Sequence, residues 1–148
     1  MSETVLAPYV HRVQYYETDM MGITHHANYI RWMEEARIDW MDRLGFPYAE
    51  MEKRGIFSPV RSVQCAYRRS TTFGDLVAVN VSVRSFNGVV MVIGYDMRRA
   101  DTGETLCEAQ SEHVFLNREG RFVRLKREWP AFCEAIERMM GEGKGGEP

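Results

Sequence analysis

One short segment of the chain places a carboxylate and two imidazoles between two expected elements of secondary structure. The segment, YYETDMMGITHHANYIRWMEEARIDW, covers residues 15–40. Asp19 follows a strand-like run, Gly22 lies in the turn that comes next, and the adjacent His25 and His26 precede a helical pattern. Carboxylates and imidazoles serve as nucleophiles, general acids and general bases, so this segment is the first candidate for a reaction centre.

The position of these residues at the start of a helix favours acyl transfer to water. We expect Asn28 to be the N-cap, so the backbone N–H groups just before it lack helical partners and can stabilise a developing oxyanion. The Asp19 carboxylate, a short turn away, can attack a bound carbonyl or take a proton from an attacking water. Gly22 lets the backbone come close to a ligand.

Each of these residues also has a structural interpretation, and on spacing alone that interpretation is the more common one for Asp19. Asp19 can form an Asx turn, Gly22 can serve the turn alone, and His25 and His26 can be a solvated pair. Adjacent histidines do not readily bind one metal ion, so we expect no metal site.

The rest of the chain predicts one long helix and a series of antiparallel strands. The helix is expected from Asn28 to Leu44 and ends at Gly45. Its apolar face carries Tyr29, Met33, Ala36, Trp40, Met41 and Leu44. Arg37 lies inside this apolar arc, and we expect its stem to be buried and its guanidinium to pair with Glu34 at the surface.

Strand patterns and hairpin turns follow the helix. Strands are expected at 8–16, 56–69, 76–86, 89–100, 105–117 and 122–126, with a terminal helix at 128–140. The apolar helix face can bury only against this sheet. The predicted fold is therefore α+β with the hot dog architecture, a long central helix wrapped by a curved antiparallel sheet of about five to six strands. Residues 1–140 form a single domain, and we expect residues 141–148 to be a disordered tail.

Composition narrows the classes of function. The chain has 148 residues with a net charge of -2, which gives no electrostatic argument for binding nucleic acid. No apolar run reaches the ~18 residues of a membrane span, and no secretory signal precedes the first strand. Cys65, Cys107 and Cys133 lack metal-ligand spacing. Together these features predict a reduced, cytoplasmic setting.

Residues 15–37 resemble the signature of the 4-hydroxybenzoyl-CoA thioesterase family of hot dog proteins, which includes the YbgC-like acyl-CoA thioesterases. That signature runs from a strand through an Asp and a Gly to a His-Ala-x-Tyr helix start and an acidic–Ala–Arg helix centre. The residues that fit it are Tyr15, Thr18, Asp19, Gly22, His26, Ala27, Asn28, Tyr29, Glu34, Ala36 and Arg37. His25 departs from it, since YbgC-like proteins tend to have Tyr there. The similarity extends to about Lys126.

The resemblance implies hydrolysis of an acyl-CoA thioester. No cofactor is implied, because coenzyme A is part of the substrate. Asp19 would be the catalytic carboxylate, as nucleophile or general base, and His26 would supply a polarising backbone N–H and an orienting side chain. Tyr15, Gly22 and His25 would contact the substrate.

Arginine pairs at strand ends are candidates for the coenzyme A phosphates. Arg68 and Arg69 are our first choice and Arg98 and Arg99 the second, since guanidinium groups match phosphates well. The structural alternative is that these arginines only solubilise the strand ends.

Several points stay open at the level of sequence. The acyl carrier is coenzyme A or an acyl carrier protein, and the acyl chain length and its aromatic or aliphatic character are not determined. Hot dog sites usually lie at a dimer interface, and edge strands favour pairing, so we expect a homodimer or homotetramer. Two other functions remain: a hot dog acyl-CoA hydratase or dehydratase, and a non-catalytic module that binds acyl-CoA or acyl carrier protein.

Overall fold

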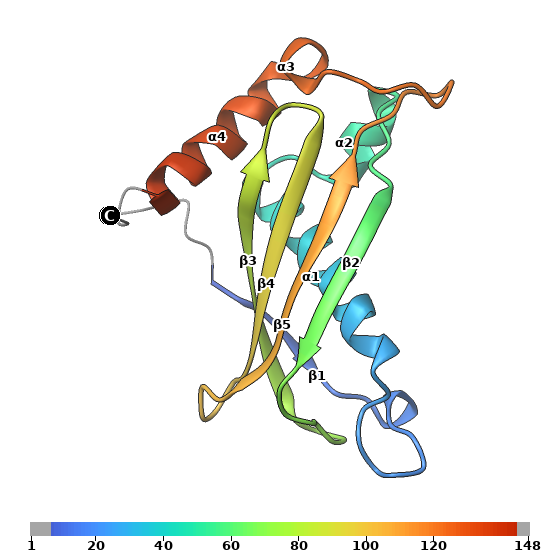
Figure 1. Cartoon of the computed structure of the whole chain (residues 1–148), viewed down its shortest axis with the longest axis vertical. Coiled ribbons are helices and arrows are strands. Elements are labelled where there is room, and N and C mark those ends of the chain that lie inside the picture. The colour runs from blue at the N-terminus through green and yellow to red at the C-terminus, as the bar shows by residue number, and fades with distance from the viewer. Residues whose placement is uncertain (1–6, 145–148) are drawn as a thin grey trace.

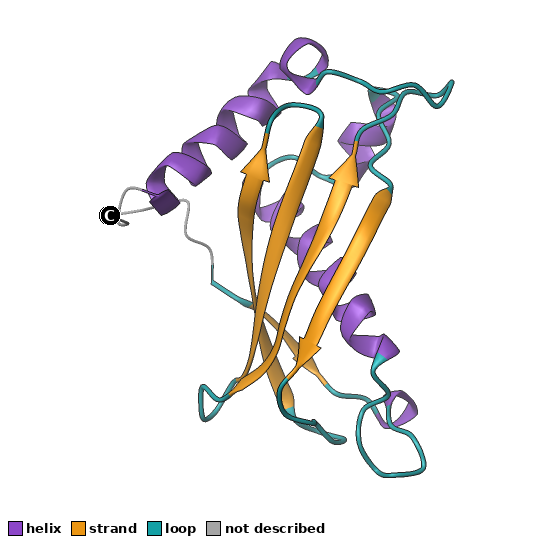
Figure 2. Ribbon diagram, viewed as in Figure 1, coloured by secondary structure: helices purple, strands orange, loops and turns teal. Residues whose placement is uncertain are grey.

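The computed structural model describes residues 7–144 and contains one five-stranded antiparallel sheet in the order β1-β3-β4-β5-β2. Helix α1 runs along one face of this sheet, behind it in Figure 1, and Figure 2 shows the same layers. The strands are β1 (Tyr9–Arg12), β2 (Val60–Tyr67), β3 (Leu76–Phe86), β4 (Val90–Arg99) and β5 (Thr105–Val114). The helices are the 3-10 helix η1 (Tyr15–Glu17), α1 (Ala27–Leu44), α2 (Tyr48–Lys53), α3 (Leu125–Glu128) and α4 (Pro130–Lys144). The predicted α+β architecture is confirmed.

Helix α1 supplies one side of the hydrophobic core. Its large side chains Trp32, Met33, Trp40 and Met41 are almost fully buried, in one cluster with inward-facing residues of the sheet. These sheet residues include Val77, Val79, Ile93, Tyr95 and Met97. Burial of each large apolar side chain contributes about 1.5–3 kcal/mol, so this contact holds the helix firmly in place.

Three predicted segments differ from the structure. The first strand ends at Arg12 because the chain turns into η1, where the Gln14 N–H donates to the carboxylate of Glu17. The strand expected at 122–126 does not form, because Leu125 is buried and starts α3, with its N–H bonded to the Gly88 carbonyl. Helix α4 continues to Lys144, so the expected tail begins as helix, and residues 145–148 lie outside the described residues.

The predicted surface pair of Arg37 and Glu34 is wrong. Arg37 is only 7% exposed, and its guanidinium donates to two tyrosine hydroxyls, Tyr48 at 2.9 Å and Tyr95 at 3.2 Å. The helical periodicity identifies the face on which Arg37 lies, but the hydroxyls belong to α2 and β4. The result is a buried positive charge that is solvated by hydroxyl groups.

A chain of hydroxyls leads from Arg37 to a buried histidine. The Tyr95 hydroxyl lies 2.6 Å from Ser111 Oγ, which lies 2.7 Å from His113 Nε2. Burial, together with the charge of Arg37, lowers the pKa of His113 to about 4. The imidazole is therefore neutral at pH 7.

We expect the protein to lose stability as the pH falls from 6.5 toward about 4. In that window the unfolded chain takes up a proton at His113 while the folded chain does not, so protonation favours unfolding. The pKa difference corresponds to about 3 kcal/mol at most. Urea unfolding across this pH range measures it. His113→Gln removes the titrating group, so its unfolding free energy should fall less, and equal declines in both proteins would contradict the assignment.

Candidate active site

Asp19 lies in a tight, exposed loop directly after η1. Its N–H donates to the Ile23 carbonyl, and its carbonyl accepts from the Gly22 N–H, each at 2.9 Å. Carboxylate Oδ1 accepts from the Met21 N–H at 2.8 Å, as in an Asx turn. The second oxygen, Oδ2, has no partner among residues 7–140. Asp19 thus shapes its own loop with one oxygen and keeps the other open.

Helix α1 starts one residue earlier than expected, and its N-cap is His26 instead of Asn28. Asn28 turns its side-chain amide back to donate to the carbonyls of Glu17 at 3.0 Å and His25 at 3.2 Å. His25 Nδ1 accepts from the Ala27 N–H at 3.1 Å. A Tyr at this position has no ring nitrogen to accept that bond, so this contact distinguishes His25 from the Tyr of the resembled signature.

The backbone N–H of His26 is the open donor at this helix end. It has no hydrogen-bond partner within residues 7–144, whereas the N–H of His25 is bonded to the Glu17 carbonyl at 2.8 Å. The His26 ring is exposed and stacks on His25 with centroids 4.4 Å apart. Tyr67, at the end of β2, donates its hydroxyl to the His26 carbonyl at 3.1 Å. An open carboxylate oxygen and an open N–H at a positive helix end therefore belong to the same short stretch, 19–26.

Buried hydroxyls fasten this stretch to the loop before β3. Thr24 Oγ1 lies 2.6 Å from Thr71 Oγ1, which lies 3.0 Å from the hydroxyl of Tyr29 on α1. Nearby, the Thr72 hydroxyl donates to the Gly22 carbonyl at 2.8 Å. Burial raises the pKa of Tyr29, so this hydroxyl stays protonated and can donate in the cluster.

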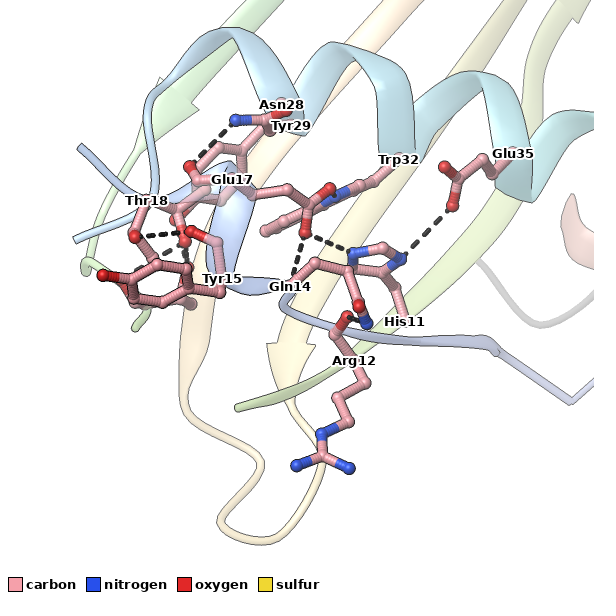
Figure 3. Close-up of polar contacts among 12 residues, drawn as sticks. His11, Arg12, Gln14, Tyr15, Glu17, Thr18, Asn28, Tyr29, Trp32 and Glu35 are labelled. Carbon is pink, nitrogen blue, oxygen red and sulfur yellow. Dashed lines mark hydrogen bonds and ion pairs between the residues drawn. The ribbon is translucent and has the colours of Figure 1, made fainter. Parts of the chain in front are cut away.

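Figure 3 shows a buried carboxylate just before the Asp19 loop. Glu17 is 3% exposed, and its Oε1 accepts from the Gln14 N–H and from His11 Nε2, each at 2.8 Å. Its Oε2 accepts from Trp32 Nε1 at 2.9 Å. Burial acts to raise the pKa of Glu17, but these hydrogen bonds outweigh it and lower the pKa. Glu17 is therefore ionised at neutral pH.

Sequence reasoning missed Glu17, Tyr67 and Thr71. The only local signal for Glu17 is its position three residues after Gln14, which resembles the spacing of a capping box. Tyr67 and Thr71 reach the site from another part of the chain. No local pattern in the sequence reveals such contacts.

Tyr15 lies at the surface beside the site. It is exposed, and its ring meets that of Phe73 edge to face at 5.8 Å. Its hydroxyl has no hydrogen-bond partner in the described part of the chain, and Met20 and Met21 are exposed near it in sequence. Exposed apolar side chains therefore flank Asp19 along the sequence.

The strand-end arginines are paired with carboxylates. Arg68 binds Glu108 at 2.9 Å, and Arg69 binds Glu104 at 3.2 Å. The second pair is held in the same way, Arg98 by Asp96 and Arg99 by Asp75 and Glu104. Exposed pairs such as Arg68–Glu108 contribute only about 0–1 kcal/mol, so a phosphate can displace the carboxylate.

A second group of arginines lines a cavity of about 280 Å³ at the other end of the sheet, between α2 and α3. Arg54, Arg124 and Arg127 contribute to its wall, together with a single acidic side chain, Glu128. Arg54 pairs with Glu50, whereas Arg124 and Arg127 make no ion pair within the described residues. The cavity is therefore a candidate site for an anion.

The described residues contain no candidate metal cluster, no disulfide and no helix suited to cross a membrane. Within residues 7–144, no three His, Cys, Asp or Glu side chains converge in a way that would hold a metal ion. All three cysteines are free thiols, with Cys107 and Cys133 buried and Cys65 half-buried. None of the described helices has both the length and the apolar character needed to cross a bilayer.

Comparison with known proteins gives consistent matches along nearly the whole chain. The thioesterase-like superfamily matches residues 13–137. A proposed acyl-CoA thioesterase, YneP, from Bacillus subtilis is 35% identical over 85% of this chain and 91% of that protein. The structure of a DHNA-CoA thioesterase from Staphylococcus aureus, 31% identical, superposes with a TM-score of 0.89 over 95% of this chain and 94% of that one. A hypothetical protein from Aquifex aeolicus, 27% identical, superposes with a TM-score of 0.80 over 86% of this chain and 97% of that one.

We expect Gly22→Ala to cost about 1–2 kcal/mol of unfolding free energy, because Gly22 has φ +81 and an L-residue is strained there. A Cβ at this position would meet nothing within 4 Å, so backbone strain is the whole cost. Gly103→Ala is the matched control, with φ +78 and equally open surroundings. Urea unfolding should give similar losses for both variants. A much larger loss at Gly22 would mean that its loop is packed more tightly than the structure shows.

Proposed function

The chain belongs to the thioesterase-like superfamily and is a thioester hydrolase with the hot dog fold, and on this premise we propose that it hydrolyses acyl-CoA at the Asp19 loop. Membership confirms the resemblance of residues 15–37 to hot dog thioesterases. The products would be a free carboxylic acid and coenzyme A. The reaction would need water and no cofactor.

One observation carries the proposal: a free N–H at the start of α1 and an open oxygen of Asp19 flank the same short loop. A thioester carbonyl that accepts from the His26 N–H would be polarised, and the positive end of α1 would stabilise the oxyanion. Asp19 would take a proton from water, which attacks the carbonyl carbon, or would attack that carbon itself. In either route the C–S bond breaks, and the thiolate of coenzyme A leaves and gains a proton. If Asp19 itself attacks, the resulting acyl-Asp19 anhydride would then be hydrolysed by water, which frees the carboxylic acid and restores the Asp19 carboxylate.

The site side chains around Asp19 and His26 have distinct proposed roles. The exposed His26 ring would orient water or substrate, and Gly22 would let the substrate approach the loop. Tyr15 would border the acyl group, since its ring lies open at the surface beside Phe73. His25 would act mainly through its bond to the Ala27 N–H, which leaves the His26 N–H as the open donor.

The coenzyme A phosphates have three candidate sites: Arg68 and Arg69, Arg98 and Arg99, and the arginine-lined cavity. The position of the cavity is relevant to oligomerisation. The cavity lies next to the start of β2, whereas the other end of β2 reaches His26 through Tyr67. The eight residues of β2 span seven steps, so its two ends lie roughly 23 Å apart. If the edge strand β2 pairs with β2 of a second copy, antiparallel pairing puts the cavity of one copy near the Asp19 loop of the other. We therefore propose a homodimer in which Arg124 and Arg127 receive the phosphates, with Arg68 and Arg69 as the alternative.

We expect Asp19→Asn to reduce hydrolysis of acyl-CoA by about 100-fold or more, because the carboxylate provides the nucleophile or the base. The measurement is release of free thiol from a panel of aromatic and aliphatic acyl-CoAs. Asp42→Asn is the matched control, since Asp42 is an exposed carboxylate near the far end of α1.

Other outcomes of the same assay would overturn this function. An unchanged rate in Asp19→Asn would refute the proposed role of Asp19. Hydration of an enoyl-CoA without thiol release would identify a hydratase. Saturable binding of acyl-CoA without either reaction would identify a binding module.

We expect the double variant Arg124→Gln/Arg127→Gln to raise KM for acyl-CoA by about tenfold or more, because each charge-assisted contact to phosphate contributes more than 1 kcal/mol. KM for the corresponding acyl-pantetheine, which lacks the nucleotide, should not change. Arg68→Gln/Arg69→Gln tests the alternative, and the same effect in that variant instead would move the phosphates to the end of β2. Sedimentation should report a dimer, and a monomer would rule out the shared arrangement.

A further inference from the structure

Glu17 connects the two halves of the proposed reaction centre. Its carbonyl accepts from the His25 N–H, just before α1, at 2.8 Å and from Asn28 Nδ2, in the first turn of α1, at 3.0 Å. Only Thr18 separates it from Asp19 along the chain. Any shift of Glu17 would therefore change the position of the Asp19 carboxylate relative to the His26 N–H.

The side chain of Glu17 is held from two other elements. Trp32 donates to it from one turn inside α1, and His11 contacts it from β1 (Figure 3). A carboxylate buried without partners costs several kcal/mol, so Glu17 occupies its place only while these donors are present. The backbone of η1 is thus fixed by a charge that cannot easily move.

His11, which contacts Glu17, lies between two carboxylates. Its Nε2 lies 2.8 Å from Glu17 Oε1, and its Nδ1 lies 3.3 Å from Glu35 Oε1. Glu35 Oε1 also accepts from the Tyr9 hydroxyl at 2.9 Å, and the His11 ring lies 4.7 Å from that of Trp32. On the neighbouring strand β3, His11 faces Val77, which carries no charge. The contact with Glu17 has the length of a hydrogen bond, which an imidazole that carries its proton on Nε2 can donate.

We propose that Glu17, hydrogen-bonded to His11, Gln14 and Trp32, is a positioning residue that sets the Asp19 carboxylate against the His26 N–H. This inference rests on the proposed thioesterase reaction at Asp19. Glu17 and His11 need not touch the substrate. They act through the backbone of residues 17–25, which the pair ties to β1 and α1.

The first test compares kcat and KM in Glu17→Gln. Gln has almost the same shape but cannot accept from Gln14, His11 and Trp32 together, so the loop should shift. We expect kcat for acyl-CoA to fall by about 100-fold, as small displacements of reacting groups commonly cause, while KM changes little. Ser111→Ala is the control for lost stability, because it breaks the separate buried hydroxyl chain next to His113. If kcat falls equally in that control, the effect is structural and the proposal is wrong.

The second test asks whether a donor at position 11 is sufficient. His11→Gln retains an amide donor at the place of Nε2, whereas His11→Leu retains none. We expect kcat of His11→Leu to fall as far as that of Glu17→Gln, and His11→Gln to recover most of the loss. Equal activity of the two His11 variants would overturn the role of the hydrogen bond.

Amide hydrogen exchange keeps the inference separate from the proposed function. The N–H groups of Asp19, Gly22 and His25 are all hydrogen-bonded around the loop. Glu17→Gln should speed their exchange while the amides of β4 stay protected. Unchanged exchange at these three amides would refute the positioning role. This result decides the inference even if the wild-type protein releases no thiol from any acyl-CoA, an outcome that would refute the proposed function alone.

Discussion

The rest of the structure depends on the burial of one face of α1 against a single antiparallel sheet. Trp32, Met33 and Trp40 fill the space between helix and sheet, and removal of such a side chain from a core costs about 2–5 kcal/mol. The helix is therefore fixed along its length. Its first turn lies at the end of the sheet where the loop after η1 and the loop before β3 meet (Figure 1). A backbone N–H at that end has a fixed direction, which is what a preorganised oxyanion site requires.

Among the described residues, the charged side chains of Glu17 and Arg37 are both buried, and they differ in the kind of group that solvates them. Glu17 is surrounded by N–H donors from Gln14, His11 and Trp32. Arg37 is instead bound by the hydroxyls of Tyr48 and Tyr95, and its positive charge helps to lower the pKa of His113 by electrostatic repulsion. The first arrangement lies beside the Asp19 loop. The arrangement around Arg37 joins α1 to β4 and β5, and it contributes to stability.

Periodicity and turn residues predict the long helix, the hairpins and the sheet, because these depend on neighbours along the chain. The short stretch from Asp19 to His26 is also predictable, since its unusual residue types lie together. The environments of Asn28 and Arg37 are not predictable in this way. Asn28 is recruited by the Glu17 carbonyl, and Arg37 by hydroxyls of α2 and β4. Which contact wins depends on how distant segments pack, and a single sequence does not display that.

The groups proposed to carry out the reaction lie close together along the sequence, and this has an evolutionary consequence. The Asp19 carboxylate, the free His26 N–H and Glu17, which we propose positions them, all come from the stretch between Gln14 and His26. The walls around them come from elsewhere, with Tyr67 at the end of β2 and Phe73 in the loop before β3. Mutations in the walls can therefore alter which acyl group fits without disturbing the reacting groups. A scaffold divided in this way can diversify its substrates by changing loops and strand ends while one inherited segment continues to perform the same reaction.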